Sequence, residues 1–232
     1  MKNKKNLEHL KALCDFTDNI YISKMGKEYV QALNSVFSLV NKNDRPFTIE
    51  EILEQPTLLE FSFEGKMDFK YICDLKAKPL MIMDEKRDNE KIIATNFVNQ
   101  NAIKIFEESL GVAYIITAFI DDTDYIVKFG QTRTTFKLRL NSYNCGVVNN
   151  WRTASTTNIK MLQSMVTTRL TFHLYIFDCS DEPYILTWCN ETSTPFASPK
   201  SLAVEDIMVN KFIEQFKKRP LANIQANATS KN

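Results

Sequence analysis

The sequence predicts an α+β protein, because segments with helical spacing of apolar residues alternate with short runs rich in β-branched and aromatic residues. Two such runs, separated by an acidic turn, predict a hairpin in the C-terminal half, and a third strand follows later in the chain. At 232 residues and 44% hydrophobic content, the chain can bury a core as one domain with appendages or as two small domains.

The N-terminal half is predicted to be mainly helical with a few short strands. Its predicted elements are helices over residues 6–16 and 24–42, a short helix opened by the capping box of Thr48 with Glu51 and ended by Pro56, two or three strands between residues 58 and 83, a charged loop over residues 84–91, and a helix over residues 95–110 with Gly111 after it. We therefore expect an N-terminal accessory segment over residues 1–110, which contributes to recognition or dimerisation.

The C-terminal half, residues 111–224, is predicted to be a second domain, followed by a polar, disordered tail over residues 225–232. Its predicted elements are hairpin strands at residues 114–119 and 125–129 around a turn at residues 121–124, a helix that begins after Thr132 or Thr134, a long loop over residues 144–157, a helix over residues 158–168, a strand over residues 170–178 and a last helix over residues 201–218.

Charge is distributed unevenly along a chain whose formal net charge is only +1. Between Tyr125 and Phe177 there is no Asp or Glu. Seven basic residues fall in the same window: Lys128, Arg133, Lys137, Arg139, Arg152, Lys160 and Arg169. A face that binds a polyanion would be built in this way, since carboxylates there would repel phosphate groups. A chance gap in the use of acidic residues is the alternative interpretation.

The cysteine and histidine content argues against a disulfide scaffold and a zinc site. The five cysteines are widely spaced, odd in number and contain no CxxC pair, and only His9 and His173 accompany them. The first 15 residues lack the apolar core of a secretory signal, and no later run is long and apolar enough to span a membrane. We therefore expect a cytoplasmic protein with reduced thiols.

The order of the C-terminal elements and their residues resembles the GIY-YIG nuclease superfamily over residues 112–223. Family members carry Gly-Ile-Tyr where this chain has Val112 to Tyr114, and Tyr-Ile-Gly where it has Lys128 to Gly130. Only Tyr114 and Gly130 match literally. Lysine in place of the second tyrosine is a variant of some restriction endonucleases in the superfamily, and these members are the most similar in pattern.

The resemblance implies a small three-stranded antiparallel sheet flanked by helices and a set of site residues. The family arginine matches Arg139, the metal-binding glutamate matches Glu205, and the asparagine in a Pro-Leu-x-Asn context matches Asn223. Tyr114 would be the general base, Arg139 would stabilise charge on the phosphate, and Glu205 would hold Mg²⁺ or another divalent cation. Gln131 is a further candidate for positioning water or phosphate.

Lys128 has a physical role in this scheme, because a free phenol has a pKa near ~10 and is a poor base at neutral pH. A nearby ammonium favours the phenolate and lowers that pKa. In an antiparallel hairpin centred near Asp121 and Asp122, Tyr114 and Lys128 come out nearly opposite each other. The pairing fails if the two side chains lie on opposite faces of the sheet.

Residue type alone leaves several alternatives open. Arg133 and Lys137 compete with Arg139 as phosphate contacts, and Glu191 and Glu214 compete with Glu205 as the metal ligand. Tyr114 also fits an ordinary aromatic residue of a strand, and Asn223 fits a residue that turns the chain after the last helix. The family order favours the residues named above.

The resulting hypothesis is a metal-dependent DNA endonuclease, of the type II restriction class, that acts on double-stranded DNA as a homodimer. The expected nucleic-acid contacts are Arg133, Lys137, Trp151, Arg152 and Lys160. One alternative is a non-catalytic nucleic-acid-binding protein, or a phage or mobile-element protein, that keeps the same scaffold. Another is a structural protein whose acid-free window has no partner.

Overall fold

A computed structural model describes residues 47–77, 93–143, 156–180, 185, 187–193 and 200–224. The predicted helices over residues 6–16 and 24–42, the charged loop over residues 84–91 and the tail over residues 225–232 lie outside the described residues. In the part of the chain that the structure describes, no helix is long and apolar enough to cross a bilayer.

The chain divides into two compact units, and the larger one contains most of the sheet. This larger unit comprises residues 49–75, 95–140 and 170–232, and the smaller one comprises residues 1–48, 76–94 and 141–169. The division does not coincide with the predicted boundary near residue 110, because segments from both halves of the sequence belong to each unit.

The described elements follow one another in this order: α3 (Ile49–Leu53), the 3-10 helix η1 (Lys66–Asp68), β1 (Lys70–Ala77), β2 (Ile93–Phe97), α4 (Gln100–Glu108), β3 (Val112–Ile120), β4 (Thr123–Thr132), α5 (Phe136–Tyr143), α6 (Thr156–Thr168), β5 (Thr171–Asp178), β6 (Thr187–Trp188), β7 (Glu191–Thr192) and α7 (Lys200–Phe216). The class is α+β, as the sequence predicts.

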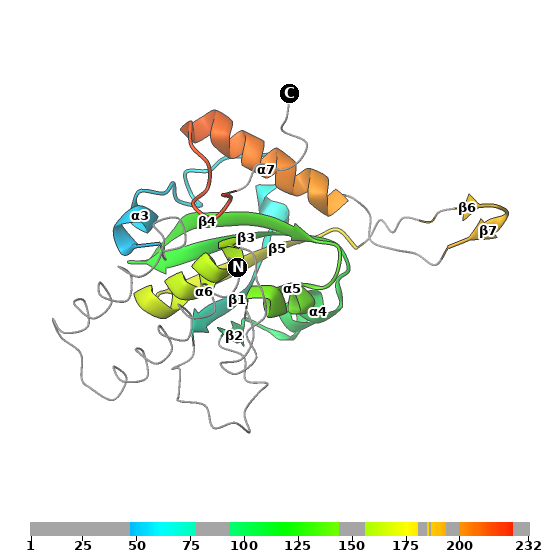
Figure 1. Ribbon diagram of the computed structural model, residues 1–232, viewed down its shortest axis with the longest axis horizontal. Helices are drawn as coiled ribbons and strands as arrows, with labels where there is room; N and C mark the ends of the chain where they lie inside the picture. The colour runs from blue at the N-terminus through cyan, green and yellow to red at the C-terminus, as the bar shows by residue number, and fades with distance from the viewer. Residues whose placement is uncertain are drawn as a thin grey trace, which may run out of the picture. The chain divides into compact units, whose positions relative to one another are not determined.

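The main sheet has five strands in the order β2-β1-β5-β3-β4, so the prediction of a three-stranded sheet is wrong (Figure 1). The pairings β1 with β5, β5 with β3 and β3 with β4 are antiparallel. Sequence alternation identified strand-forming residues before residue 83, but it carries no information about the partner strand. Pairs such as Tyr71 with Tyr175 join the N-terminal segment to the sheet of the C-terminal half.

The predicted helix over residues 95–110 is also corrected, because its first residues form β2. Ile93 to Phe97 extend as a strand, and α4 begins only at Gln100. Asn99 defines that start: its backbone is extended, outside the helix, and its side chain accepts a hydrogen bond from the amide of Ala102. An N-cap of this kind satisfies an amide that otherwise lacks an intrahelical partner.

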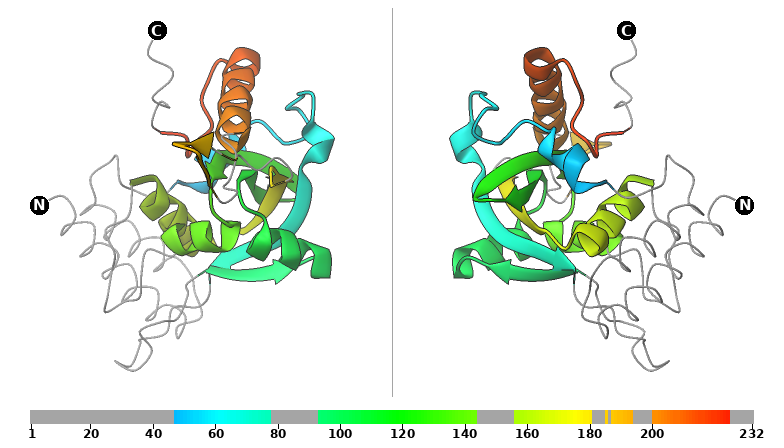
Figure 2. Two further views of the ribbon diagram at one scale, coloured as in Figure 1. Left: turned by 90° about the vertical axis from the view of Figure 1, so that its right-hand side faces the viewer. Right: turned by 90° about the vertical axis from the view of Figure 1, so that its left-hand side faces the viewer.

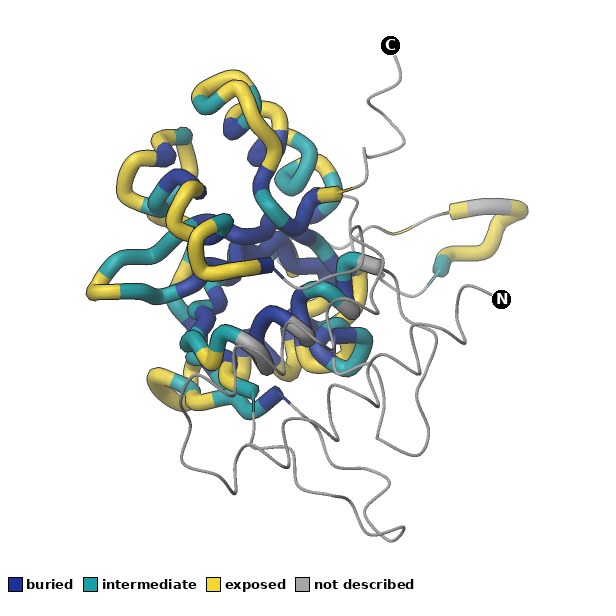
Figure 3. The backbone as a smooth tube through the Cα atoms, turned by 60° about the vertical axis from the view of Figure 1, so that its left-hand side comes forward, coloured by how far each residue is buried: buried dark blue, intermediate teal, exposed yellow. Residues whose placement is uncertain are grey.

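One face of the sheet is covered by α7, which lies over β3 and β4 (Figures 1 and 2). The core on this face is aromatic and aliphatic, with Phe61, Ala113, Ile115, Ile126, Phe129, Met208, Val209 and Phe212 all buried. Phe129 meets Phe212 edge-on at 5.6 Å between ring centroids. Figure 3 shows the consequence, since the central strands are buried along most of their length while the outer side of α7 is exposed.

The opposite face of the sheet is packed by α4 and the start of α5. Phe136, the first residue of α5, contacts Tyr114 of β3 edge-on at 4.9 Å and Phe106 of α4 at 5.5 Å. Phe106 in turn contacts Phe97 at the end of β2. This chain of ring contacts fixes α5 against the sheet through its first turn.

The hairpin between β3 and β4 turns at Asp121 and Asp122, whose φ angles are 46° and 58°. Two consecutive positive φ angles are typical of the two-residue turns that match the twist of the flanking strands, and aspartate tolerates this conformation better than most residues. The strands are longer than predicted, and they pair from Val112 with Thr132 to Ile120 with Thr123.

Candidate active site

Tyr114 in β3 lies directly against Gly130 in β4. The two residues are paired in the sheet, and the tyrosine side chain is fully buried. A Cβ atom at position 130 would lie 2.2 Å from Cζ of the ring and 2.3 Å from its hydroxyl oxygen. Position 130 therefore requires glycine because of this close approach, and not because of its backbone conformation.

Arg139 reaches the same tyrosine from α5. Its Nε atom donates a hydrogen bond of 3.1 Å to the hydroxyl oxygen of Tyr114. Phe136 lies three residues earlier on α5, so the two side chains fall on one face of the helix and both contact the tyrosine ring or its hydroxyl. The helix thus holds the ring by packing and the oxygen by a charged donor.

A β-bulge decides which face of the sheet carries Lys128. Ile116 pairs with Lys128, whereas the next residue, Thr117, pairs with Ile126, so Val127 is the extra residue. Without this insertion the register from the turn would place Lys128 opposite Ile115, on the face away from Tyr114. With it, Tyr114 and Lys128 share a face, as diagonal neighbours and not as a directly opposed pair.

Lys128 is almost completely buried, with 7% of its surface exposed. Burial lowers the pKa of its ammonium to about 8, the carboxylate of Glu205 acts in the opposite direction, and the charge of Arg139 lowers the pKa further. The ammonium donates a hydrogen bond of 3.3 Å to the backbone oxygen of Ala222. Lys128 is therefore a desolvated cation in the fields of two other site residues.

Glu205 completes the group from α7. Partial burial holds the pKa of its carboxyl above the ordinary value. The neighbouring Asp206 also raises this pKa, whereas the charges of Lys128 and Arg139 lower it. The competing acids are placed differently: Glu191 lies exposed in the short β6–β7 hairpin, and Glu214 lies exposed near the end of α7, where it pairs with Lys211 at 3.3 Å. Among these three glutamates, Glu205 is the one that interacts with the buried lysine.

The competing basic residues lie on the surface. Arg133 is exposed, just beyond the end of β4. Lys137 is exposed on α5 and forms an ion pair of 3.1 Å with Glu107 of α4. Lys160 belongs to α6 in the smaller unit, where its ammonium lies 4.9 Å from the ring centroid of Phe47. Trp151 and Arg152 lie outside the described residues.

Gln131 and Asn223 both form hydrogen bonds that tie other segments to β4. Ser201 in the first turn of α7 donates to Oε1 of Gln131 at 3.4 Å, which ties the start of that helix to the end of the strand. Asn223 is buried, and its side-chain amide bonds to the backbone of Phe129, accepting from the amide at 2.9 Å and donating to the oxygen at 3.0 Å.

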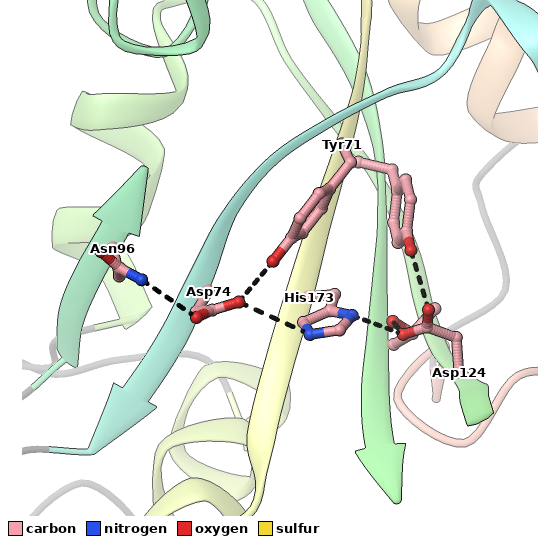
Figure 4. A network of polar contacts seen from close by, with 7 residues as sticks. Tyr71, Asp74, Asn96, Asp124 and His173 are labelled. Atoms are coloured by element: carbon pink, nitrogen blue, oxygen red, sulfur yellow. Dashed lines mark hydrogen bonds and ion pairs between the residues drawn. The ribbon is translucent and has the colours of Figure 1, made fainter. Parts of the chain in front are cut away.

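A second polar cluster, which sequence reasoning missed, is centred on His173 of β5 (Figure 4). Nδ1 of His173 lies 2.9 Å from Asp124, and Nε2 lies 3.5 Å from Asp74. The remaining oxygen of Asp124 accepts a bond of 2.8 Å from Tyr175, and Asp74 accepts from Tyr71 and from Asn96. The sequence signal was the alternation of His173 and Tyr175 on one face of a strand.

This cluster is internally satisfied, since both oxygens of Asp74 and both oxygens of Asp124 accept bonds or ion pairs from neighbouring side chains. It joins β1, β5 and the β3–β4 hairpin, and we interpret it as a structural network. Among the described residues, no group of three or more His, Cys, Asp or Glu side chains is arranged to hold a metal ion.

No protein-family model matches the chain, and no curated protein matches it. Similar solved structures include two endonucleases. A restriction endonuclease, HPY188I, in complex with product DNA shares 24% identity, with coverage of 80% of this chain and 96% of that chain and a TM-score of 0.49. A point mutant of bacteriophage T4 EndoII shares 18% identity, with coverage of 67% and 92% and a TM-score of 0.39. At these values, neither likeness establishes a shared fold or activity.

Proposed function

We propose that this chain is a metal-dependent DNA endonuclease of the GIY-YIG type. The proposal is supported by one observation above the others: Arg139 of α5 bonds to Tyr114 of β3, Lys128 of β4 shares the face of Tyr114, and the charge of Glu205 of α7 acts on Lys128. These four are among the residues that the motif resemblance selects, and their chemistry is that of phosphodiester hydrolysis.

Tyr114 is the proposed general base. Its hydroxyl oxygen accepts a hydrogen bond from the Arg139 guanidinium, and Lys128 shares its face of the sheet. A charged donor and a nearby cation both favour the phenolate form. The phenolate would remove a proton from the attacking water, and the guanidinium of Arg139 would stabilise the charge that builds on the phosphate.

Glu205 fits the role of a magnesium ligand. Mg²⁺ is commonly held by one or two carboxylates, together with water and substrate phosphate oxygens, so a single carboxylate is a sufficient protein contribution. Glu205 is half-buried and lies in the field of the same two cations that serve Tyr114. When bound, the ion would neutralise charge on the scissile phosphate and its leaving oxygen.

The finer proposal is a type II restriction endonuclease that cuts double-stranded DNA as a homodimer. The four-residue site carries no means of reading bases, so recognition requires further surfaces. The accessory segment over residues 1–110, together with Trp151 and Arg152, is proposed for this role, because a stacking aromatic and an arginine are suited to contacts with base edges.

Cleavage of supercoiled plasmid DNA with and without Mg²⁺ tests the activity. We expect nicked and linear products from the full chain with Mg²⁺, and none from Glu205→Gln, which should bind DNA as tightly as the wild type. Glu214→Gln is the matched control, since it makes the same change at an exposed position of the same helix.

Two outcomes would count against the proposal. Turnover retained by Glu205→Gln would place the metal carboxylate elsewhere. Salt-dependent DNA binding by the wild type with no cleavage under any divalent cation would favour the non-catalytic nucleic-acid-binding protein instead.

A further inference from the structure

The segment Pro220–Asn223, which follows α7, lies along the outer edge of β4. The amide of Ala222 donates a hydrogen bond of 2.9 Å to the backbone oxygen of Val127, the bulged residue. The Asn223 side chain bonds to both backbone groups of Phe129 at 2.9 and 3.0 Å. Ala222 and Asn223 are both buried, although the strand they contact is at the edge of the main sheet.

A primary amide suits this position because it presents a donor and an acceptor in one plane, as a peptide group does. Asn223 therefore takes the place of a residue in a neighbouring strand and satisfies both polar groups of Phe129. An edge strand with unpaired groups would otherwise be open to solvent or to another chain. The first part of β4 is covered similarly, by the backbone of Pro56 and Leu58.

This edge pairing has a consequence for Lys128, which lies between Val127 and Phe129. The carbonyl of Ala222 is brought to 3.3 Å from the buried ammonium of Lys128. A buried ammonium is costly without acceptors, so the carbonyl both stabilises it and fixes its direction. Lys66 offers a comparison within the same unit, since its ammonium also donates to backbone carbonyls, among them that of Phe61 at 2.9 Å.

We propose that Asn223 is a positioning residue: it holds the segment Pro220–Asn223 on the edge of β4, so that the Ala222 carbonyl keeps Lys128 on the face of Tyr114. Asn223 acts through Lys128 and does not contact the reacting atoms. Its effect on cleavage rests on the proposed function, whereas the coupling between the segment and Lys128 does not.

The test is the substitution Asn223→Asp, followed by a measurement of the accessibility of Lys128. The introduced carboxylate accepts from the amide of Phe129 but places a second oxygen against its carbonyl, so the segment should leave the edge and expose the lysine. An amine-reactive acylating reagent at fixed pH, with labelled peptides quantified by mass spectrometry, reports each lysine separately. We expect labelling of Lys128 to become at least tenfold faster, with Lys137 unchanged as an exposed internal reference.

Asn210→Asp is the matched control, because Asn210 is exposed on α7 and the substitution adds the same charge. It should leave the labelling rate of Lys128 as in the wild type. An unchanged rate in a folded Asn223→Asp protein would overturn the proposal. A general rise that includes Lys66 would indicate unfolding, and Asn223→Ala, which removes both bonds without adding a charge, then decides on the same criterion.

Hydrogen exchange of the unaltered protein gives a measurement that needs no variant. The amides of Phe129 and Ala222 should exchange together and at least tenfold more slowly than that of exposed Asn101 on α4. Exchange of these two amides as fast as that of Asn101 would refute the edge pairing. If the protein cleaves DNA, Asn223→Asp should lower kcat with little change in KM and should alter the pH profile. The labelling and exchange tests do not require nuclease activity, so they test the edge pairing even if the protein does not cleave DNA.

Discussion

Tyr114 is positioned by its close contact with Gly130 on one side and by a hydrogen bond from a charged donor on the other. Gly130 leaves the space that its ring fills, and Arg139 holds its hydroxyl oxygen. Sequence matching identified Tyr114 and Gly130 as the two literal matches to the family pattern. The structure gives the physical reason for their association, since the tyrosine ring occupies the space that a side chain at position 130 would need.

Gly130→Ala should destabilise the protein by about 1–3 kcal/mol, which is typical of inserting a methyl group into a packed site. The added Cβ would meet the tyrosine ring at 2.2 Å, so either the ring or the strand must move. Urea denaturation measures the cost. A double-mutant cycle with Tyr114→Ala provides the control, because the alanine should cost much less where the ring is absent. Equal costs in the two backgrounds would show that the ring does not clash.

Lys128→Met should change both the rising and the falling limb of the pH profile of cleavage. Burial lowers the pKa of Lys128 to about 8, so the ammonium that favours the Tyr114 phenolate is present below that pH and is lost above it. The wild-type rate should therefore fall above roughly pH 8, whereas the variant should lack this fall and should gain activity only at higher pH. Single-turnover rates measure both limbs. Lys137→Met, at an exposed position, should keep the wild-type profile.

At the scale of elements, the β-bulge at Val127 matters most for the candidate site. One extra residue in β4 moves Lys128 and Gly130 to the face of Tyr114, and it leaves Phe129 on the α7 face with Phe212. In the sequence, both strands are runs rich in β-branched and aromatic residues, and nothing in them marks the bulge. Only the hydrogen-bond register shows where the facing of the side chains is reversed.

The His173 network joins separate strands, and its carboxylates should make the free energy of unfolding depend on pH in the acidic range. Burial opposes ionisation of Asp124, but hydrogen bonds from His173, Thr117 and Tyr175 outweigh it and hold the pKa of the carboxyl below its ordinary value. A carboxyl with a lowered folded-state pKa stabilises the fold above its unfolded pKa, and this contribution is lost as the pH falls through the folded pKa.

Asp124→Asn should therefore lower the free energy of unfolding by about 1–3 kcal/mol near neutral pH and should flatten its decline below about pH 4. Urea denaturation across this pH range measures both effects. Asp122→Asn is the matched control, because Asp122 lies exposed in the adjacent turn and asparagine also tolerates its positive φ. An equally steep acid decline in the Asp124 variant would assign the pH dependence to other groups.

At the scale of the whole molecule, charge is balanced overall but locally segregated. The chain has a formal net charge of +1, while the window from residue 125 to residue 177 contains no acid. The described basic residues of this window differ in their surroundings. Arg133 is exposed beyond β4, whereas Lys137 is already paired with Glu107. The two residues should therefore contribute unequally to the binding of a polyanion.

Arg133→Ala should weaken DNA binding uniformly across sequences and should reduce the slope of log affinity against log salt by about 1. Lys137→Ala should reduce the slope by less, because binding must first break an ion pair with Glu107. Lys211→Ala, at an exposed position of α7, serves as the reference. Fluorescence anisotropy titrations with a short duplex at several salt concentrations measure the slopes. Equal slopes for all three variants would remove Arg133 from the nucleic-acid interface.

The sequence by itself determined the α+β class, most helices and strands after residue 111, and the identities of the candidate site residues. These properties depend on local spacing, turn chemistry and residue type, which act over a few neighbouring positions. The sequence did not determine the five-stranded sheet, the strand at Ile93 to Phe97 or the network around His173. Each of these depends on partners far away in the chain.

Tertiary structure alone decided whether the candidate residues meet. The sequence of β4 is compatible with either face for Lys128, and the bulge at Val127 resolves this because an inserted residue reverses the facing of those beyond it. Arg139 reaches the hydroxyl of Tyr114 because Phe136, three residues earlier, packs α5 against the tyrosine ring. Asn223 acquires its partners in the same way, since it meets Phe129 only after α7 has crossed the sheet.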